Sequence, residues 1–77
     1  MAALVTALAT DFTPAVGDFI IQVTGGSASL TRRNVTGAAT ATVGVIDSGG
    51  AVICSNPIAG AVYQLVSSNG ATVRADQ

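Results

Sequence analysis

Several residue types that carry common protein chemistry are missing from this chain of 77 residues. It contains no Lys, Glu, His or Trp, and it has a single cysteine. Without histidine and with one thiol, the usual zinc, haem and cysteine–histidine sites cannot be assembled. We therefore expect no metal site and no other cofactor.

Charge is also scarce, since 9% of the residues are charged and the net charge is −1. The positive charges are three arginines, whereas strong phosphate-driven binding of nucleic acid commonly uses about six to ten contacts. We therefore expect no nucleic-acid partner. The acids are four aspartates, and no two of them lie close together in the sequence. Because no carboxylate pair is marked for acid–base work, we expect that the protein is not an enzyme.

Long hydrophobic runs are absent, although 49% of the residues are hydrophobic and the mean hydropathy is +0.61. Gly, Ser, Asn, Pro and Gln interrupt the uncharged stretch between Asp47 and Arg74, so no run of about 18 apolar residues exists and we expect no membrane helix. Residues 1–9 faintly resemble a signal peptide, but they lack its basic first part. We interpret them as an N-terminal strand or arm.

What the sequence does contain is a series of short runs in which polar and apolar residues alternate. Ala, Val, Gly, Thr and Ser make up 48 of the 77 residues, a composition that disfavours helix. The runs are punctuated by Gly, Asn and Pro, which is typical of strands joined by turns. The predicted strands are 4–10, 18–24, 27–33, 38–47, 51–55, 61–68 and 71–76.

Two of the turns predict β-hairpins. Gly25-Gly26 allows positive φ at both positions, and we predict a hairpin over residues 18–33. Asn69-Gly70 is a strong short-range hairpin pattern, which predicts a second hairpin over residues 61–76. Six to seven short strands at this spacing predict an all-β fold, either a small antiparallel β-sandwich or a barrel.

A chain of this size has little material for a core of its own. A domain of about 60 residues buries only about 60% of its unfolded surface, and Ala and Val each contribute little area. No disulfide is available, and segments such as 19–21 and 51–53 are apolar on both sides and need a cover on each face. We therefore expect oligomerisation to complete the fold. The alternative is a monomer with scattered exposed Ala and Val.

Two single residues invite a structural interpretation. Cys54 lies among Val52, Ile53 and Ser55 with no charge beside it, so we expect a buried and unreactive thiol. Tyr63 is expected to be a packed aromatic residue whose hydroxyl lies at the rim of the core. Asn56-Pro57 is interpreted as the end of a strand.

Two sequence blocks resemble a pattern found in small virion proteins of phages and prophages. Residues 17–32 fit the pattern G-D-F-x-x-Q-V-x-G-G-x-A-x-L-x-R. A second block of the form P-x-x-G-x-x-Y-x-L follows at Pro57, Gly60, Tyr63 and Leu65. Together with the segment between them, the blocks cover residues 17 to about 75. Those proteins often carry a Trp-containing strand between the blocks and an Arg at the position of Gln64, and this chain has neither.

The resemblance implies a compact β-sandwich that serves as a building block of virions. We expect a capsid decoration (cement) protein that trimerises and clamps neighbouring subunits of the phage major capsid protein. Its place would be the capsid exterior, after synthesis in the cytoplasm of the bacterial host. The alternative is a fibre, baseplate or tail adaptor module that contacts a host receptor. A third hypothesis is a free-standing binding domain of a bacterium.

Residues 1–16 precede the resemblance, and we interpret them as an N-terminal arm attached to a β-sandwich domain of residues 17–77. The arm is apolar, so we expect it to contact the capsid or another subunit, and its first 12 residues to be dispensable for the fold. Arg32 and Arg33 lie on opposite faces of one strand, where one of them could bind an acidic patch of a partner; a solvated strand end is the alternative. The candidate contact residues are Leu4, Val5, Leu8, Phe12, Arg32 and Arg33.

Overall fold

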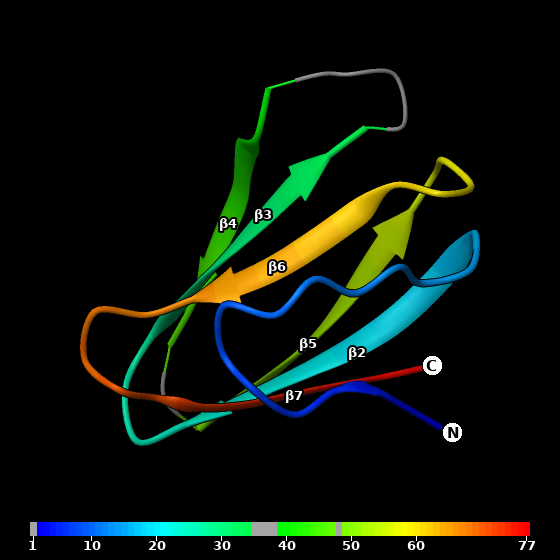
Figure 1. The fold of residues 1–77 in the computed structure, drawn as a ribbon. Coiled ribbons are helices and arrows are strands. Elements are labelled where there is room, and N and C mark those ends of the chain that lie inside the picture. The colour runs from blue at the N-terminus through cyan, green and yellow to red at the C-terminus, as the bar shows by residue number, and fades with distance from the viewer. Residues whose placement is uncertain (1, 35–38, 48) are drawn as a thin grey trace.

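The computed structural model describes residues 2–34, 39–47 and 49–77 of the chain. Seven strands form two antiparallel sheets that pack face to face (Figure 1), and the described residues form no helix. This confirms the prediction of a small all-β antiparallel fold and makes it a sandwich. The strands are β1 (Ala3–Val5), β2 (Gly17–Thr24), β3 (Ala28–Arg33), β4 (Ala41–Ile46), β5 (Gly50–Asn56), β6 (Val62–Val66) and β7 (Thr72–Asp76).

The order of the strands within the sheets differs from their order in the chain. The four-stranded sheet has the order β1-β7-β2-β5, and the three-stranded sheet has the order β4-β3-β6. Of the described strands, β3 and β4 are the one consecutive pair that is hydrogen-bonded. The other connections cross between the sheets or, after β1, skip over β7. The two termini end side by side at the four-stranded sheet (Figure 1).

Both predicted hairpins are wrong, although their turns occur where the sequence places them. Strands β2 and β3 lie in different sheets, and so do β6 and β7. Gly25 (φ 77°) and Gly70 (φ 73°) have the positive φ that such turns need, but each turn carries the chain from one sheet to the other. In a hairpin the apolar faces of the two strands would lie side by side in one sheet, whereas in this sandwich they face each other across the core. Ile21 of β2 and Leu30 of β3 are buried in the core between the sheets rather than paired along an edge.

The predicted alternation of buried and exposed residues is observed in β2 and β6, whereas five consecutive residues of β4 are exposed. In β2, Phe19, Ile21 and Val23 are fully buried, and in β6 the same holds for Tyr63 and Leu65. The strand predicted over residues 38–47 is observed as β4, with residue 38 outside the described part of the chain.

The first predicted strand is shorter than expected. Strand β1 ends at Val5, and Ala9 adopts a positive φ of 55°. This turn directs the chain away from the four-stranded sheet toward the three-stranded one. There Phe12 forms an isolated antiparallel bridge with Tyr63.

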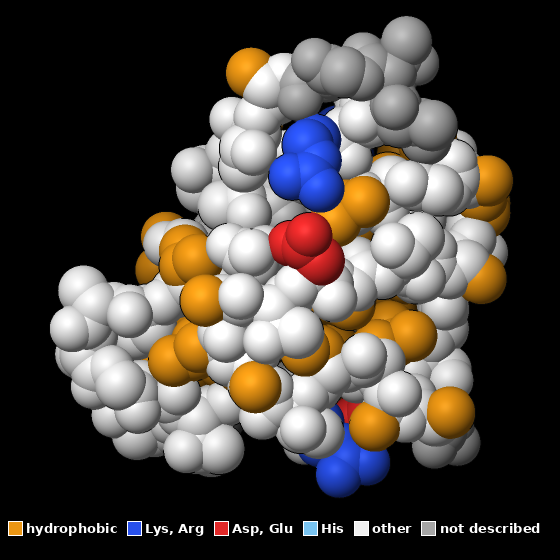
Figure 2. All heavy atoms as spheres, in the orientation of Figure 1, with side chains coloured by type: hydrophobic (Ala, Val, Ile, Leu, Met, Phe, Trp, Pro, Cys, Tyr) orange, Lys and Arg blue, Asp and Glu red, His pale blue; other side chains and the backbone are white. Residues whose placement is uncertain are grey.

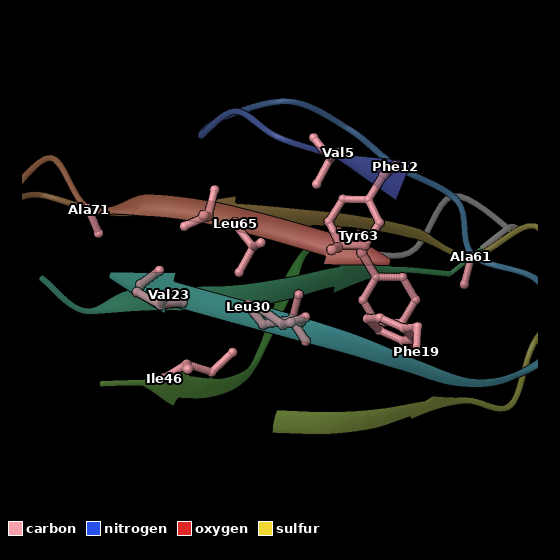
Figure 3. Close-up of a cluster of buried hydrophobic side chains, with 14 residues drawn as sticks. Val5, Phe12, Phe19, Val23, Leu30, Ile46, Ala61, Tyr63, Leu65 and Ala71 are labelled. Atoms are coloured by element: carbon pink, nitrogen blue, oxygen red, sulfur yellow. The ribbon is translucent and has the colours of Figure 1, made fainter. Parts of the chain in front are cut away.

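All three aromatic side chains meet at one end of the core (Figure 3). The ring centroids are 5.2 Å apart for Phe19 and Tyr63, 5.9 Å for Phe12 and Tyr63, and 6.1 Å for Phe12 and Phe19. These separations lie in the favourable range for aromatic pairs. The cluster therefore ties together the N-terminal segment, β2 and β6. The larger aliphatic side chains of the core are Val5, Ile21, Val23, Leu30, Ile46, Leu65 and Val73.

Candidate interaction site

Four of the six predicted contact residues are used in packing within the chain itself. Val5 and Phe12 are buried in the core, and Leu4 and Leu8 are half-buried against it. None of these four side chains is fully available to a partner in this arrangement. The apolar character of the N-terminal segment therefore reflects its packing on the sandwich.

The N-terminal segment closes one side of the sandwich. Ala2 and Gln77 exchange two backbone hydrogen bonds of 3.0 Å, and β1 pairs with β7. Further along, the amide of Ala9 donates to the carbonyl of Leu65 at 2.8 Å. Residues 2–12 thus run from the edge of the four-stranded sheet to the edge of the three-stranded sheet. The predicted arm (residues 1–16) and the predicted domain (residues 17–77) share one core in this structure.

The two candidate arginines lie on opposite faces of β3, as alternation predicts. Arg33 is exposed and its Nη2 lies 3.6 Å from Oδ2 of Asp11, whose Oδ1 accepts a hydrogen bond of 2.9 Å from Gln64. Arg32 is half-buried and lies opposite Tyr63 in the sheet register. Arg33 therefore already has an acidic neighbour in its own chain. Because both side chains of this ion pair are about half exposed, the pair contributes at most about 1 kcal/mol.

Asn56, for which the sequence predicts only the end of a strand, is buried and organises the aromatic end of the core. Nδ2 of Asn56 donates to the carbonyl of Pro14 at 3.0 Å, and its Oδ1 accepts from the hydroxyl of Tyr63 at 3.1 Å and from the amide of Ile58 at 3.2 Å. The Tyr63 ring is packed as predicted. Its hydroxyl, however, lies inside the core rather than at the rim, because Asn56 supplies a buried acceptor there.

The side of the sandwich opposite the N-terminal segment is formed by β4 and β5 (Figure 3), and we call it the open side. In the described part of the chain, no strand pairs with the outer edge of either. Large apolar side chains of both strands are exposed: Val43 (50% exposed) and Val45 (65%) on β4, and Val52 (38%) and Ile53 (70%) on β5. In the sheet register Val45 lies opposite Ser29 and Ile53 opposite Ile20, so these two side chains point to the outer faces of the two sheets.

A hollow of about 170 Å³ lies between the two strands of the open side. Val52 and Cys54 of β5 are paired in register with Ile21 and Phe19, whose side chains are buried. Since opposed residues share a face of the sheet, Val52 and Cys54 point toward the interior but are incompletely covered. The hollow is therefore an opening of the core toward solvent. Its lining is Leu30, Val43, Gly44, Val45, Ile46, Val52 and Cys54.

Electrostatically, the open side is neutral. Neither β4 nor β5 contains a charged residue. Burial raises the pKa of the Cys54 thiol above its ordinary value of 9.0, so near neutral pH the thiol is protonated and weakly nucleophilic. The cysteine is half-buried rather than fully buried, because it faces the hollow.

The charged residues lie elsewhere on the molecule. On the four-stranded sheet, Nε of Arg74 donates to both carboxylate oxygens of Asp76 at 2.9 Å, and this bond raises the pKa of Arg74. Figure 2 shows charged side chains as a few isolated groups on a mostly uncharged face.

Among residues 2–34, 39–47 and 49–77, no three acidic or cysteine side chains gather as a metal site would require. No helix long and apolar enough to cross a membrane occurs in this described part.

Comparisons of the chain with protein-family models, with curated proteins and with solved structures find no match. Its function is therefore inferred from its residues and their geometry.

Proposed function

We propose that this chain is a capsid decoration protein, a structural building block of a virion. In this proposal its copies form a homotrimer on the capsid exterior, where they clamp neighbouring subunits of the major capsid protein. The observation that carries the proposal is the open side, where exposed apolar side chains of β4 and β5 accompany two free sheet edges in the described structure.

The open side supports assembly for two physical reasons. Contiguous exposed apolar surface is rare on monomeric soluble proteins and commonly marks a protein contact. A free strand edge offers backbone N–H and C=O groups to which another chain can add a strand. Association would therefore be stabilised by burial of Val45 and Ile53 together with new backbone hydrogen bonds.

The resemblance to small virion proteins supports the proposal through the fold. Its first block covers β2, the turn after it and most of β3. Its second block leads into β6, where Tyr63 and Leu65 are fully buried. Several of the shared positions thus build the core, among them Phe19, Leu30 and Tyr63, whereas the shared Asp18 and Gln22 are exposed.

Immunogold electron microscopy would test where the protein resides. Virions would be produced from the bacterial host that carries the corresponding phage, and labelled with antibody raised against the purified chain. Gold particles spread over the heads would support the decoration role, with pre-immune serum as the control. Gold at the tail or its fibres would instead favour the fibre, baseplate or tail adaptor role. Unlabelled virions in a culture that contains the protein would refute a virion role and favour the bacterial binding domain.

The clamping mechanism has its own test. Heads produced without the protein should break open at a lower temperature than complete heads, because the contacts between neighbouring capsid subunits lack their clamp. Adding the purified chain to such heads should restore their heat stability. If heads with and without the chain release their contents at the same temperature, the protein does not stabilise the capsid.

A further inference from the structure

We infer that the open side is the surface at which copies of this chain bind one another, with the β4 edge of one copy against the β5 edge of the next. The inference deepens the proposed function, on which it rests for the expectation of a homo-oligomer, by naming the surface of contact. It differs from the expectation drawn from the sequence, which assigned subunit contacts to residues 1–16 and to the two arginines of β3.

The chain covers one of its two sides and leaves the other bare. At the covered side, the N-terminal segment pairs with β7 through β1 and with Tyr63 of β6 through Phe12. Exposed edges in soluble proteins are commonly protected by charged residues, proline, β-bulges or very short strands. Strands β4 and β5 are six and seven residues long and contain neither a charged residue nor a proline. Neither edge is protected by charge, proline or a short length, and β5, whose pairing with β2 is regular, has no bulge either.

An irregularity in β4 adds to the apolar surface. The register between β3 and β4 shifts between Leu30 and Thr31, where Leu30 pairs with Gly44 and Thr31 pairs with Thr42. Val43 is thus the additional residue of a β-bulge. Val43 is among the residues that line the hollow, so the bulge adds an apolar residue to the open side and no polar one.

A contact of standard size would use a substantial part of the surface of this chain. A standard interface covers about 800 Å² of each partner, which is about a fifth of the 4118 Å² that this chain exposes. Nine of the thirteen residues in β4 and β5 are exposed, so almost the whole length of both strands is available.

A second copy fits the chemistry of this surface. It brings an equally uncharged side, so no charge would be buried without a counter-charge. Ile53, the most exposed of the large apolar side chains on one copy, matches the apolar hollow of another. The ion pairs Asp11–Arg33 and Arg74–Asp76 involve neither β4 nor β5 and would keep their present partners.

The experiment measures solution mass by light scattering over a tenfold dilution, for the wild type and three single variants. Val45→Asp and Ile53→Asp place a charge on β4 and on β5, at side chains that are exposed in the single chain. Val16→Asp is the matched control, because Val16 is 59% exposed and lies on a loop outside both strands. We expect the wild type and the Val16 variant to have two or three times the chain mass of 7.5 kDa. The two open-side variants should have the single-chain mass at the same concentrations, with unchanged circular dichroism.

The alternatives give different results. Open-side variants that keep the wild-type oligomeric mass would overturn this inference and leave the homo-oligomer and the virion role standing. A wild type of single-chain mass throughout would overturn both the inference and the homo-oligomer, while the immunogold result would still decide the virion role. If that single chain bound empty heads and Val45→Asp did not, the occupant of the open side would be the capsid protein instead.

A second measurement covers the case in which the aspartate variants fail to fold. Amide hydrogen exchange of the wild type would be compared at high and low protein concentration. Stronger protection of β4 and β5 at the high concentration, with unchanged protection of β1, is the expected result. Equal protection of β4 and β5 at both concentrations, in a sample whose mass changes with dilution, would overturn the inference.

Discussion

The hydroxyl of Tyr63 donates a hydrogen bond of 3.1 Å to Oδ1 of Asn56, and both residues are buried where the three aromatic rings meet. Through Nδ2, the same asparagine binds the carbonyl of Pro14 in the N-terminal segment. A polar side chain at this depth is stabilising only because each of its groups has a partner. Asn56 therefore links β6 and the N-terminal segment to the end of β5.

Removing this hydroxyl should have a modest cost. We expect Tyr63→Phe to lower the free energy of unfolding by about 1 kcal/mol, because one buried hydrogen bond is lost while Asn56 keeps its other partners. Tyr63→Ala should cost about 3 kcal/mol or more, because the ring fills the core. Urea unfolding at fixed protein concentration measures both. A loss below about 0.5 kcal/mol for the alanine variant would show that the ring does not belong to the core.

The Phe12 side chain should contribute strongly to the free energy of unfolding, because it is buried in the core. The expectation from the sequence was that residues 1–12 are dispensable for the fold, and the burial of Val5 and Phe12 reverses it. We expect Phe12→Ala to destabilise the protein by about 3 kcal/mol or more, and deletion of residues 1–12 to leave little folded protein. Thr13→Ala, at an exposed neighbouring position, is the control and should have almost no effect. A folded and cooperative deletion variant would instead support an independent arm.

The two glycines of the turn between β2 and β3 should respond differently to alanine. Gly25 has a φ of 77°, so Gly25→Ala should cost about 1–2 kcal/mol whatever surrounds it. At Gly26 an added Cβ would lie 2.5 Å from Oδ1 of Asn69, a flexible side chain that can move away.

We expect Gly26→Ala to cost less than Gly25→Ala, and this cost to disappear in an Asn69→Ala background. Thermal unfolding of the two double mutants measures the coupling. If Asn69→Ala relieves both substitutions equally, or neither, the distinction between backbone strain and side-chain crowding is incorrect.

Cys54 should make stability depend on pH above its ordinary pKa of 9.0. Burial raises the pKa of the thiol in the folded chain, so above about pH 9 the unfolded chain releases this proton more readily than the folded one. The thiol's contribution to stability is therefore present below pH 9 and is lost as the pH rises further. We expect the stability of the wild type to decline more steeply than that of Cys54→Ala between pH 8 and pH 11. Parallel pH curves for the two proteins would show that the thiol is solvated in the folded state.

The sequence by itself determined where the strands lie and which face of each is apolar. In β2, Phe19, Ile21 and Val23 alternate with residues that are polar except for Ile20, and this pattern indicated both the strand and its buried face, because side chains in a strand alternate with a period of two. Gly25 and Gly70 marked the turns, since glycine adopts positive φ without steric cost. These properties depend on neighbours in the chain, and the sequence contains them directly.

Only the tertiary structure decided which strands pair, which residues close the core and which surface stays open. The turns at Gly25 and Gly70 are compatible with a hairpin or with a crossing between sheets, and the choice depends on how the apolar faces of β2, β3, β6 and β7 cover one another. Asn56 is buried because Tyr63 and Pro14 come from elsewhere to bind it. Likewise, Val45 and Ile53 are exposed because they lie on the outer faces of the two sheets, opposite Ser29 and Ile20, where no further layer of the described structure covers them. Such relationships join residues far apart in the chain, so no local pattern contains them.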